Sequence, residues 1–459
     1  MTGGVTPDLA QLRAELGGAR VLSDPALMES YRRDRTTVVP AGVPLAVVEA
    51  SSVDHVVATL RWASRHRVPV VTRGGGTSLA GGATAIDGGV VLSLARMDAI
   101  VEIAPDERLA VVEAGVITAD LDRAARAHGL MYAPDPSSHE ICTIGGNLAT
   151  NAGGLRCLKY GVTRDSALGL EVVLADGRRV QTGHRTVKGV VGYDLTGLFV
   201  GSEGTLGVIT SATMRLRPRP PVAPVTLAAT FPTLRAAAEA VSAISRAGVG
   251  ASLLELMDRG TLRAIDDWKH IGVGAKAAAM LLAQCDGPDA ADAAEKIAAL
   301  CQAAGGVDVV VAADESEAAH LLDLRRLAYP ATERLGSCLV EDVCVPLPAL
   351  RAMIERIEAA AQAHQVVIAT VAHAGDGNLH PVFVFPRGLA EPPAEVWAAA
   401  DEVFRAALAL GGTLTGEHGV GSLKRRWLGQ ELAGESLALH HAIKGALDPL
   451  GIMNPGRAI

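Results

Sequence analysis

The stretch Val68-Pro-Val-Val-Thr-Arg-Gly-Gly-Gly-Thr-Ser-Leu-Ala-Gly-Gly82 decides the fold that we predict for this chain. Residues 68–72 are mostly β-branched and predict a buried strand, and a run rich in glycine follows at once. The run is not the fingerprint of a Rossmann fold, because Leu79 stands where the third glycine belongs and no helix continues from it. Its backbone N–H groups and two hydroxyls can still enclose a pyrophosphate, and an ordinary glycine-rich turn between strands is the alternative.

Two more glycine-rich segments extend this pattern along the chain. Residues 144–154 read Ile-Gly-Gly-Asn-Leu-Ala-Thr-Asn-Ala-Gly-Gly, and residues 201–210 read Gly-Ser-Glu-Gly-Thr-Leu-Gly-Val-Ile-Thr. A turn-like stretch, Pro134-Asp-Pro-Ser-Ser138, comes before them. Glycine lets the backbone approach a bound molecule closely. Three such segments in one region therefore favour a long ligand that contacts many stretches of backbone.

The size and composition of the chain narrow its class. At 459 residues it is too long for one hydrophobic core, so two or three domains are expected. Its 42 basic and 50 acidic residues give a net charge of -8, which argues against nucleic acid as a partner. The apolar runs are too short for a membrane span, and the N-terminus lacks the features of a secretion signal. We expect a soluble, cytoplasmic protein that reaches a membrane only through a partner.

A proline-rich stretch, Pro218-Arg-Pro-Pro-Val-Ala-Pro224, marks the clearest domain boundary, because so many prolines cannot continue a central strand or helix. We predict a first domain at residues 1–218, a second at 219–410 and a C-terminal segment at 411–459. Strand-like and helix-like patterns alternate in the second domain, which predicts an α+β architecture. Its predicted elements include strands at 225–230, 252–257 and 339–345 and helices at 234–247, 316–327 and 349–364.

The octapeptide His373-Ala-Gly-Asp-Gly-Asn-Leu-His380 carries the clearest sign of chemistry in the second domain. Strand-like runs at residues 366–372 and 379–385 flank a turn of glycine, aspartate and asparagine, which predicts a hairpin. Cross-strand neighbours on one face of a hairpin lie close together, so the two histidines can converge on one ligand. Two histidines do not complete a metal site, and ordinary surface or core histidines are the alternative.

Glu417 offers the carboxylate that such a site needs. It lies next to His418, between glycines of residues 411–421, in a loop that ends a predicted strand. Two histidines and one carboxylate leave positions open on a divalent metal ion, which is the pattern of catalytic zinc, manganese or iron. His373, His380 and Glu417 would complete such a set of metal ligands, but a solvated glutamate is the usual interpretation of Glu417 as long as the residues are taken alone.

Residues 73–82, 134–138, 144–154 and 201–210 resemble, in this order, the FAD-binding domain of the vanillyl-alcohol-oxidase-like flavoproteins. The branch with the glycolate oxidase catalytic subunit, D-lactate dehydrogenase and D-2-hydroxyglutarate dehydrogenase is most similar, and it shares the His-x-Gly-Asp-Gly-Asn-x-His and Gly-Glu-His-Gly motifs. The resemblance runs from about residue 40 to the C-terminus. It implies an α+β fold: a two-subdomain FAD-binding domain, an α+β substrate (cap) domain with an antiparallel sheet, and a C-terminal helical segment that returns to the flavin.

The resemblance also implies which residues contact the FAD. The loop after residue 73 would hold the pyrophosphate, and the later segments would line the isoalloxazine and the adenine. Some family members attach FAD through a histidine in the glycine loop, but this chain has Gly76-Thr77-Ser78 there, so the FAD is expected to be non-covalent. The implied cofactor-binding residues are Arg73, Gly74, Gly75, Gly76, Thr77, Ser78, Gly82, Pro134, Ser138, Gly146, Asn147, Thr150, Gly153, Gly154, Glu203, Gly204, Gly207, Val208, Ile209 and Asn454.

The implied reaction is the oxidation of a D-2-hydroxy acid to the 2-oxo acid. The metal ion would bind the hydroxyl and one carboxylate oxygen, which makes removal of the hydroxyl proton easier. His418 is the expected base, after which the Cα hydride would pass to flavin N5. Arg325 would hold the substrate carboxylate through two hydrogen bonds, and Asn378 would bond the substrate or orient a ligand.

Two positions bear on the choice of acid. In the 2-hydroxyglutarate branch a threonine and a lysine help to hold a second carboxylate, and this chain has Tyr329 and Val340 there. Glycolate or D-lactate is therefore favoured, with D-2-hydroxyglutarate as an alternative.

The six cysteines include no Cys-x-x-Cys pair, so no iron–sulfur cluster is expected. Electrons would leave to a separate protein subunit, quinone or dye, and we also consider a homodimer.

Three other functions stay open at this point. The first is a flavin oxidase of the same fold that oxidises another alcohol or an amine without a metal. The second is a metallohydrolase without flavin, in which glutamate or histidine activates a metal-bound water. The third is a binding protein that kept the fold and lost the chemistry.

Overall fold

The computed structural model describes residues 9–389 and 391–459, which divide into two compact units. Of these residues, unit 1 contains 9–153, 162–219 and 417–459, and unit 2 contains 154–161 and 220–416. The change from unit 1 to unit 2 near the proline-rich stretch thus falls within one residue of position 218. Residues 417–459 pack within unit 1, whereas residues 154–161 leave the first unit to join the second.

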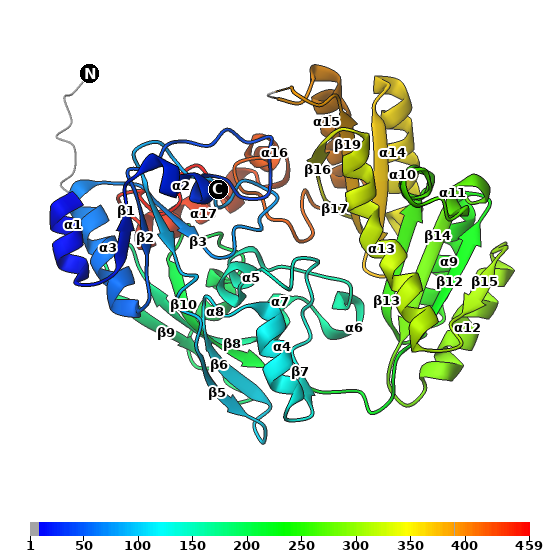
Figure 1. Ribbon diagram of the computed structural model, residues 1–459, viewed down its shortest axis with the longest axis horizontal. Coiled ribbons are helices and arrows are strands. Elements are labelled where there is room, and N and C mark those ends of the chain that lie inside the picture. The colour runs from blue at the N-terminus through cyan, green and yellow to red at the C-terminus, as the bar shows by residue number, and fades with distance from the viewer. Residues whose placement is uncertain (1–8, 390) are drawn as a thin grey trace. The chain divides into compact units, whose positions relative to one another are not determined.

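The N-terminal part of unit 1 is a four-stranded sheet in the order β1-β2-β4-β3 (Figure 1). Strands β2, β4 and β3 are parallel, and β1 is antiparallel to β2. Helix α3 begins after Ser52, whose hydroxyl accepts a hydrogen bond from the N–H of His55. The bounds are α1 (Leu9–Leu16), β1 (Arg20–Leu22), α2 (Pro25–Arg32), β2 (Ala46–Glu49), α3 (Val53–His66), β3 (Val70–Arg73) and β4 (Val90–Ser93).

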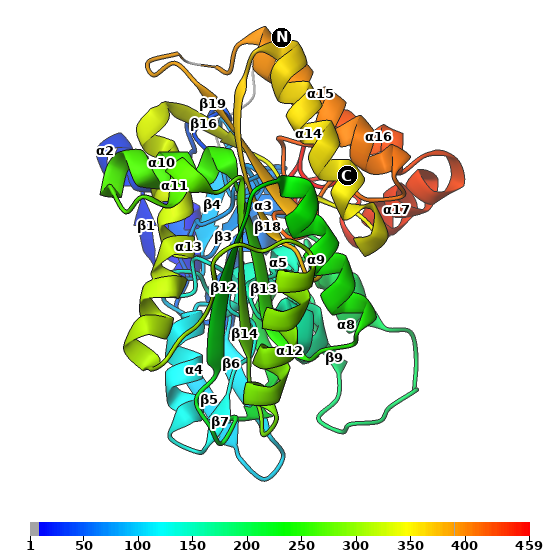
Figure 2. The ribbon, with the colours of Figure 1, turned by 90° about the vertical axis from the view of Figure 1, so that its right-hand side faces the viewer.

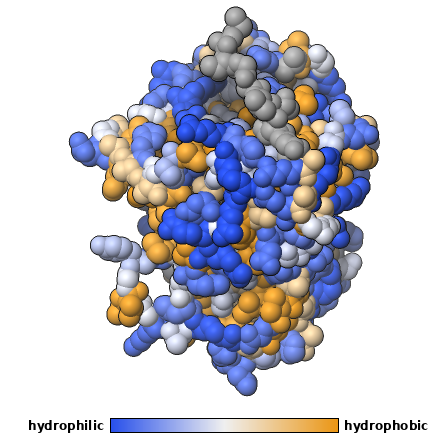
Figure 3. Space-filling model, turned by 90° about the vertical axis from the view of Figure 1, so that its left-hand side faces the viewer, coloured by the Kyte–Doolittle hydropathy of each residue, from blue (hydrophilic) through white to orange (hydrophobic). Residues whose placement is uncertain are grey.

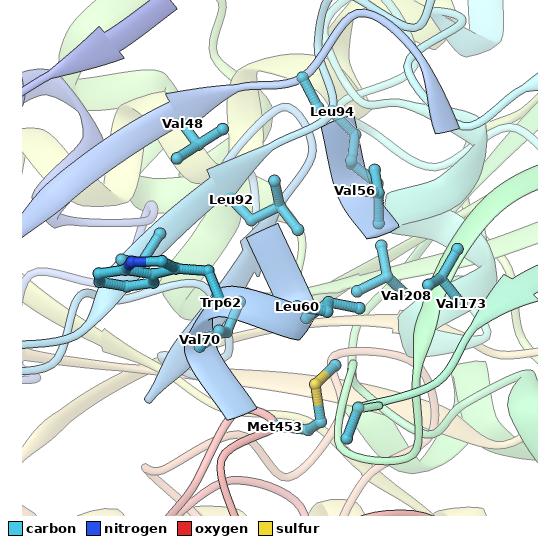
Figure 4. Close-up of a cluster of buried hydrophobic side chains, with 14 of the residues drawn as sticks. Val48, Val56, Leu60, Trp62, Val70, Leu92, Leu94, Val173, Val208 and Met453 are labelled. Carbon is cyan, nitrogen blue, oxygen red and sulfur yellow. The ribbon is translucent and has the colours of Figure 1, made fainter. Parts of the chain in front are cut away.

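A hydrophobic core connects this sheet with α3 and with the C-terminal segment (Figure 4). Leu60 and Trp62 of α3, Val70 of β3 and Met453 of the C-terminal segment are all fully buried in it. An isolated parallel bridge also pairs Val70 with Met453. The last residues of the chain therefore complete the core that begins near its N-terminus.

The second sheet of unit 1 is antiparallel, with five strands in the order β5-β6-β10-β8-β9. Its core contains Leu121 of α4, Leu148 of α5 and Leu170 of β8. The bounds are β5 (Ile100–Ala104), β6 (Leu109–Glu113), α4 (Thr118–Arg126), β7 (Leu130–Met131), α5 (Ile144–Thr150), α7 (Thr163–Ser166), β8 (Ala167–Val173), β9 (Arg179–Gly183), α8 (Leu195–Phe199), β10 (Val208–Arg215), β11 (Arg217–Pro218), α16 (Arg425–Glu431) and α17 (Gly434–Leu447).

Unit 2 contains an eight-stranded antiparallel sheet, in the order β15-β12-β14-β13-β18-β19-β16 with β17 also paired to β19. This confirms the predicted antiparallel sheet. The bounds are α6 (Cys157–Tyr160), β12 (Val225–Phe231), α9 (Leu234–Arg246), β13 (Ala251–Asp258), α10 (Arg259–Lys269), α11 (Val273–Lys276), β14 (Ala279–Cys285), α12 (Ala290–Ala303), β15 (Val309–Val311), α13 (Glu315–Leu335), β16 (Ser337–Val340), β17 (Val343–Cys344), η1 (Leu347–Ala349), α14 (Leu350–His364), β18 (Val367–His373), β19 (Asn378–Phe385) and α15 (Ala394–Ala409).

Helices cover both faces of this sheet (Figure 2). Helices α9, α12, α14 and α15 pack on one face, and α10, α11 and α13 pack together on the other. The second face has its own core, in which Met257 of β13 and Val371 of β18 meet Ile265 of α10 and Ala328 of α13. Side chains alternate along a strand, so residues 255 and 373 point to this same face, toward α13.

Two sequence-based expectations need correction in detail. Helix α13 does not end near residue 327 but continues through Pro330 to Leu335, because Ala328, Ala331 and Thr332 are buried against the sheet. The expected strand at 339–345 is two short strands, β16 and β17, with Glu341 and Asp342 between them. The glycine-rich residues 144–150 form a short helix, α5, that Thr143 caps by accepting a hydrogen bond from the Gly146 N–H.

The prediction of a strand before Glu417 is also wrong. Residues 411–416 contain only an isolated bridge between Thr413 and Cys344. Backbone hydrogen bonds run in both directions between these two residues, but the neighbouring glycines leave no side chains to pack as a strand. The loop that leads to Glu417 is therefore held at single points along its length.

The surface and the helices are consistent with the short apolar runs of the sequence. On the face drawn in Figure 3, hydrophilic residues surround small, separate hydrophobic patches. Over the described ranges, no helix combines the length and the apolar character needed to cross a membrane.

Candidate active site

Strand pairing in unit 2 brings a buried carboxylate to the predicted histidine hairpin. Strands β13 and β18 are antiparallel neighbours, and their register places Glu255 directly opposite His373. Nδ1 of His373 lies 2.6 Å from Oε1 of Glu255, and the Glu255 side chain has no exposed surface. A carboxylate can only accept a hydrogen bond, so Nδ1 carries the proton and Nε2 has the lone pair that a metal ion requires.

The two hairpin histidines lie together on this face. His373 is opposite Asn378, and Val371 is opposite His380, so the histidines are diagonal neighbours across β18 and β19. Their ring centroids are 5.0 Å apart at an interplanar angle of 84°, and one ring nitrogen of each lies within 4.8 Å of the other. The predicted convergence of the two histidines is confirmed. Both rings are buried, which suits ligands of a metal ion.

Arg325 of α13 reaches the same carboxylate. Its Nε donates a hydrogen bond to Oε2 of Glu255 at 2.7 Å, and its side chain is 15% exposed. Glu255 thus joins a predicted metal ligand to the residue predicted to bind the substrate carboxylate. Because Nε is engaged, the two terminal amino groups of Arg325 are the donors that remain for an anion.

A second buried carboxylate, Asp342, lies at the same end of the sheet. Its oxygens accept hydrogen bonds from Thr415 Oγ1 at 2.8 Å and from the Gly416 N–H at 2.7 Å. One of these oxygens lies within 4.8 Å of a ring nitrogen of His380. Asp342 therefore anchors the loop whose next residue is Glu417.

Asn378 is the first residue of β19 and is buried beneath this loop. A Cβ added to Gly416 would lie 2.6 Å from its amide, so only glycine allows the loop to pass so closely. Among the residues that the structure describes, the Oδ1 of Asn378 is buried without a hydrogen-bond partner. A buried acceptor of this kind is suited to a bound ligand.

Glu417 and His418 belong to unit 1, where glycine makes room for the glutamate. A Cβ on Gly153 would lie 2.3 Å from Oε2 of Glu417, so the backbone after α5 and this carboxylate are in direct contact. Nε2 of His418 lies 3.8 Å from Oε1 of Glu417, and both side chains are mostly buried. The two residues that were predicted as metal ligand and base therefore lie together.

Glu203 holds the backbone of the Glu417 loop in place. Its two carboxylate oxygens accept hydrogen bonds from the N–H groups of Val420 and Gly421, each at 2.8 Å. Burial raises the pKa of Glu203, while these hydrogen bonds and the charges of Lys424 and Arg457 oppose the shift. The side chain of Glu203 thus positions the neighbouring motif.

The first glycines of the loop at residues 74–82 are packed so tightly that they leave no room for a side chain. A Cβ on Gly74 would lie 2.3 Å from Thr143 Oγ1, and one on Gly75 would lie 2.4 Å from the Ile141 carbonyl oxygen. Arg73 lies under the loop and donates hydrogen bonds to backbone carbonyls, including that of Arg33 at 2.8 Å. Its guanidinium braces the loop from below.

A set of orphaned polar atoms surrounds the end of this loop. In the described part of unit 1, Thr72 Oγ1, Ser422 Oγ and Asn454 Oδ1 are buried and lack hydrogen-bond partners. The amide nitrogen of Asn454 donates to the carbonyl oxygens of Gly82 and Glu203, which ties two of the glycine-rich segments together. Buried polar atoms are nearly always hydrogen-bonded, so this arrangement fits a polar ligand such as a pyrophosphate.

A cavity of about 620 Å³ opens beside the same loop. Its walls include Tyr31, Arg73, Gly74, Gly115 and Thr143, all from unit 1. The cavity, the excluded side chains and the orphaned polar atoms together fit an extended, polar cofactor of the FAD type.

The other predicted cofactor residues fall into two groups. Asn147 makes a hydrogen bond within the fold, since its amide donates to Thr118 Oγ1 at 2.8 Å. Val208 and Ile209 begin β10 and are buried in the two hydrophobic cores of unit 1. Gly154 belongs to unit 2. The rest lie in unit 1, on the glycine-rich segments or on the stretch at residues 134–138: Gly76, Thr77, Ser78, Pro134, Ser138, Gly146, Thr150, Gly204 and Gly207.

Glu255 and Asp342 are the functional candidates that the sequence-based prediction missed. The signal for Glu255 is a carboxylate in the middle of the apolar strand Leu-Leu-Glu-Leu-Met at residues 253–257. A charge at such a position is rarely buried without a partner. The partner itself, His373, lies 118 residues further along the chain and cannot be read from the strand.

Comparison with known proteins places the chain among flavoproteins. Residues 44–183 match a family described as FAD binding domain, and residues 220–458 match one described as FAD linked oxidases, C-terminal domain. The chain is 44% identical to the glycolate oxidase subunit GlcD of Bacillus subtilis over 418 residues, which are 90% of this chain and 89% of that protein. It is 38% identical to a D-lactate dehydrogenase of Archaeoglobus fulgidus, over 94% of this chain and 96% of that protein.

Solved structures agree on the fold. The similarity to p-cresol methylhydroxylase has a TM-score of 0.81 at 20% identity and covers 100% of this chain and 97% of that one. For 4-ethylphenol oxidase from Gulosibacter chungangensis the TM-score is 0.78 at 20% identity, with 100% and 98% covered. These neighbours confirm the predicted α+β fold of the vanillyl-alcohol-oxidase type. Since the C-terminal family match alone spans more than half of the sequence, the chain belongs to the FAD-linked oxidases and is a flavoprotein oxidoreductase.

Proposed function

We propose that the protein oxidises a D-2-hydroxy acid, with glycolate or D-lactate favoured, by means of FAD and a divalent metal ion. The observation that carries this proposal is the bridge that Glu255 makes between His373 and Arg325. It connects a metal-ligand candidate with an anion-binding candidate, as expected for a substrate that offers a hydroxyl beside a carboxylate. The relatives named glycolate oxidase subunit and D-lactate dehydrogenase support the same class of substrate.

The donor set suits the two cofactors. His373, His380 and Glu417 would hold zinc, manganese or iron, and the glycine-rich segments of unit 1 would hold FAD without a covalent bond. When bound, FAD accepts two electrons as a hydride, and a divalent metal ion lowers the pKa of a hydroxyl group that it binds.

The protein side chains supply orientation and proton transfer. The terminal amino groups of Arg325 bind the substrate carboxylate, because its Nε is held by Glu255. Asn378, whose Oδ1 is buried, orients the substrate or one of the metal ligands. His418 removes the hydroxyl proton at a ring nitrogen, and its neighbour Glu417 favours the imidazolium that forms.

The size of the acid and the electron acceptor are further parts of the proposal. Tyr329 and Val340 offer no cation for a second carboxylate, which supports a small monoacid over D-2-hydroxyglutarate. The free cysteines lie apart in the sequence and support no iron–sulfur cluster, so a separate subunit, quinone or dye takes the electrons.

Flavin bleaching tests the reaction directly. Under anaerobic conditions, glycolate or D-lactate should reduce the flavin of the reconstituted protein, and L-2-hydroxy acids should not. The flavin absorbance near its long-wavelength maximum is the measurement. A protein that stays colourless after incubation with FAD would exclude the flavin chemistry. Bleaching by simple alcohols alone would favour the metal-independent oxidase.

Two further measurements separate the metal from the base. Removal of divalent metal with a chelator should abolish oxidation of the acid, and addition of zinc or manganese should restore it. His418→Ala should retain FAD and metal but lose about 100-fold to 10,000-fold in kcat, the usual contribution of a general base. His441→Ala, an exposed histidine on α17, is the matched control. Normal turnover in His418→Ala would exclude its role as the base.

A further inference from the structure

We infer that Glu255 is a positioning residue that sets the tautomer of His373 and the direction of Arg325 at the same time. This inference rests on the proposed function in so far as the nitrogen that it exposes is offered to a metal ion. The juxtaposition itself, one buried carboxylate between an imidazole and a guanidinium, stands on the geometry of unit 2 alone.

Each of the two carboxylate oxygens of Glu255 has a different partner. Oε2 of Glu255 accepts from Arg325 at 2.7 Å and Oε1 lies 2.6 Å from Nδ1 of His373. An ion pair that served stability alone would need only the arginine, and buried ion pairs add little stability over apolar packing. The second contact instead fixes which nitrogen of His373 carries the proton.

The strand register fixes this geometry. Glu255, Leu256 and Met257 of β13 pair with His373, Ala372 and Val371 of β18. Beyond the Glu255–His373 pair, the Gly375 N–H donates to the Leu254 carbonyl oxygen at 3.3 Å, which holds the hairpin turn to β13. A shift of the register by one residue would move Glu255 to the opposite face of the sheet, away from both partners.

The charge balance explains why a carboxylate is required here. Arg325 is largely buried and needs a counter-charge, and His373 must stay neutral to bind a metal ion. Glu255 satisfies both needs, because its negative charge balances the arginine while its second oxygen accepts from a neutral ring. Metal-bound histidines commonly depend on such a partner for their orientation.

Glu255→Gln separates these two tasks without a change of shape. The amide has one acceptor oxygen, and the charged Arg325 forms the stronger hydrogen bond with it. The amide NH₂ then faces His373, so Nδ1 must become the acceptor and the proton must move to Nε2. The variant should therefore invert the tautomer of His373 and remove the lone pair offered to the metal.

Nitrogen NMR of ¹⁵N-histidine-labelled, FAD-loaded and metal-free protein reads the tautomer directly. The wild-type signals of His373, identified by their loss in His373→Gln, should report a protonated Nδ1, and Glu255→Gln should report a protonated Nε2. An unchanged tautomer in a variant that retains FAD and its thermal unfolding midpoint would overturn the inference. Glu239→Gln, which removes a half-exposed carboxylate of α9 in unit 2, should leave the His373 signals as they are.

Metal titration of the same proteins adds a second readout. Zinc or manganese should bind Glu255→Gln about 10-fold to 100-fold more weakly than wild type, and Glu239→Gln should bind as wild type does. Equal affinities of wild type and Glu255→Gln would contradict the positioning role. If the wild type itself binds no metal ion, the proposed function fails, while the NMR result still decides the role of Glu255.

Discussion

At the scale of single residues, side chains of the glycine-rich motifs brace the backbone. Glu203 lies in the third such segment with a positive φ of 51°, yet its carboxylate holds the N–H groups of Val420 and Gly421. Arg73 is similarly turned onto backbone carbonyls beneath the glycine loop. Both residues position the segments around the proposed FAD site through hydrogen bonds that no local pattern reveals.

Glu203→Gln should weaken the loop that carries Glu417. An amide offers one acceptor oxygen, so one of the two N–H groups loses its partner and faces an NH₂ group. Leaving a buried donor unpaired lowers the free energy of unfolding by about 1–3 kcal/mol. Denaturant unfolding and FAD retention measure the effect, with the exposed Glu107→Gln as control. Identical unfolding curves for wild type and Glu203→Gln would show that the anchor is dispensable.

At the scale of elements, the end of β13 joins α10 to the histidine hairpin. Asp258 caps α10 by accepting from the Thr261 N–H at 2.8 Å, and its other oxygen accepts from the Thr370 N–H of β18 at 2.8 Å. One carboxylate therefore connects a helix start with the strand that ends in His373. Helix α10 was not predicted, because five charged residues interrupt its apolar spacing.

The same carboxylate should make stability depend on pH. Desolvation raises the pKa of Asp258 to about 6, above its value in the unfolded chain. Between about pH 4 and 6 the folded state then binds more protons than the unfolded state, so this group lowers stability as pH rises through that window, by up to about 3 kcal/mol. Denaturant unfolding at a series of pH values, wild type against Asp258→Asn, measures the difference. A difference that stays constant from pH 4 to 7 would refute the shift.

At the scale of the whole molecule, the chain returns to its first unit at the end. Residues 417–459 pack in unit 1, where Met453 is fully buried beside α3 and β3 and Asn454 ties Gly82 to Glu203. Arg457 donates to the carbonyl oxygens of Gly81 and Thr84, again on the glycine loop. The C-terminal segment is thus part of the core and of the loop that flanks the proposed cofactor site.

Met453→Ala should therefore destabilise unit 1, although only six residues follow this position in the sequence. Truncation of a buried methionine leaves a cavity and lowers the free energy of unfolding by about 2–5 kcal/mol. The thermal unfolding midpoint, followed by release of flavin fluorescence, measures the effect. Leu439→Ala, 61% exposed on α17, should change the midpoint little. An equal loss in both variants would contradict the core role of Met453.

The sequence by itself determined the order of the motifs, the α+β character of the second domain and the hairpin that joins His373 to His380. These features depend on short-range patterns: strand alternation, glycine-rich turns and a residue spacing of two along a strand. Together with the family resemblance, they nominated Glu417, His418 and Arg325 as partners in chemistry. The predicted bounds of α13 and of the strand at 339–345 were wrong because buried contacts with other elements override the local pattern there.

Only the tertiary structure decided which side chains meet within each unit. Glu255 and His373 are 118 residues apart, and Glu203 and Val420 are 217 apart, so their contacts depend on strand register and on the return of the C-terminal segment. Each contact joins a buried carboxylate to donors that the fold brings from elsewhere, because a charge without such partners is unstable in a core. The sequence motifs therefore indicate the reacting groups. The pairing of β13 with β18 supplies Glu255, the residue that orients His373 and Arg325.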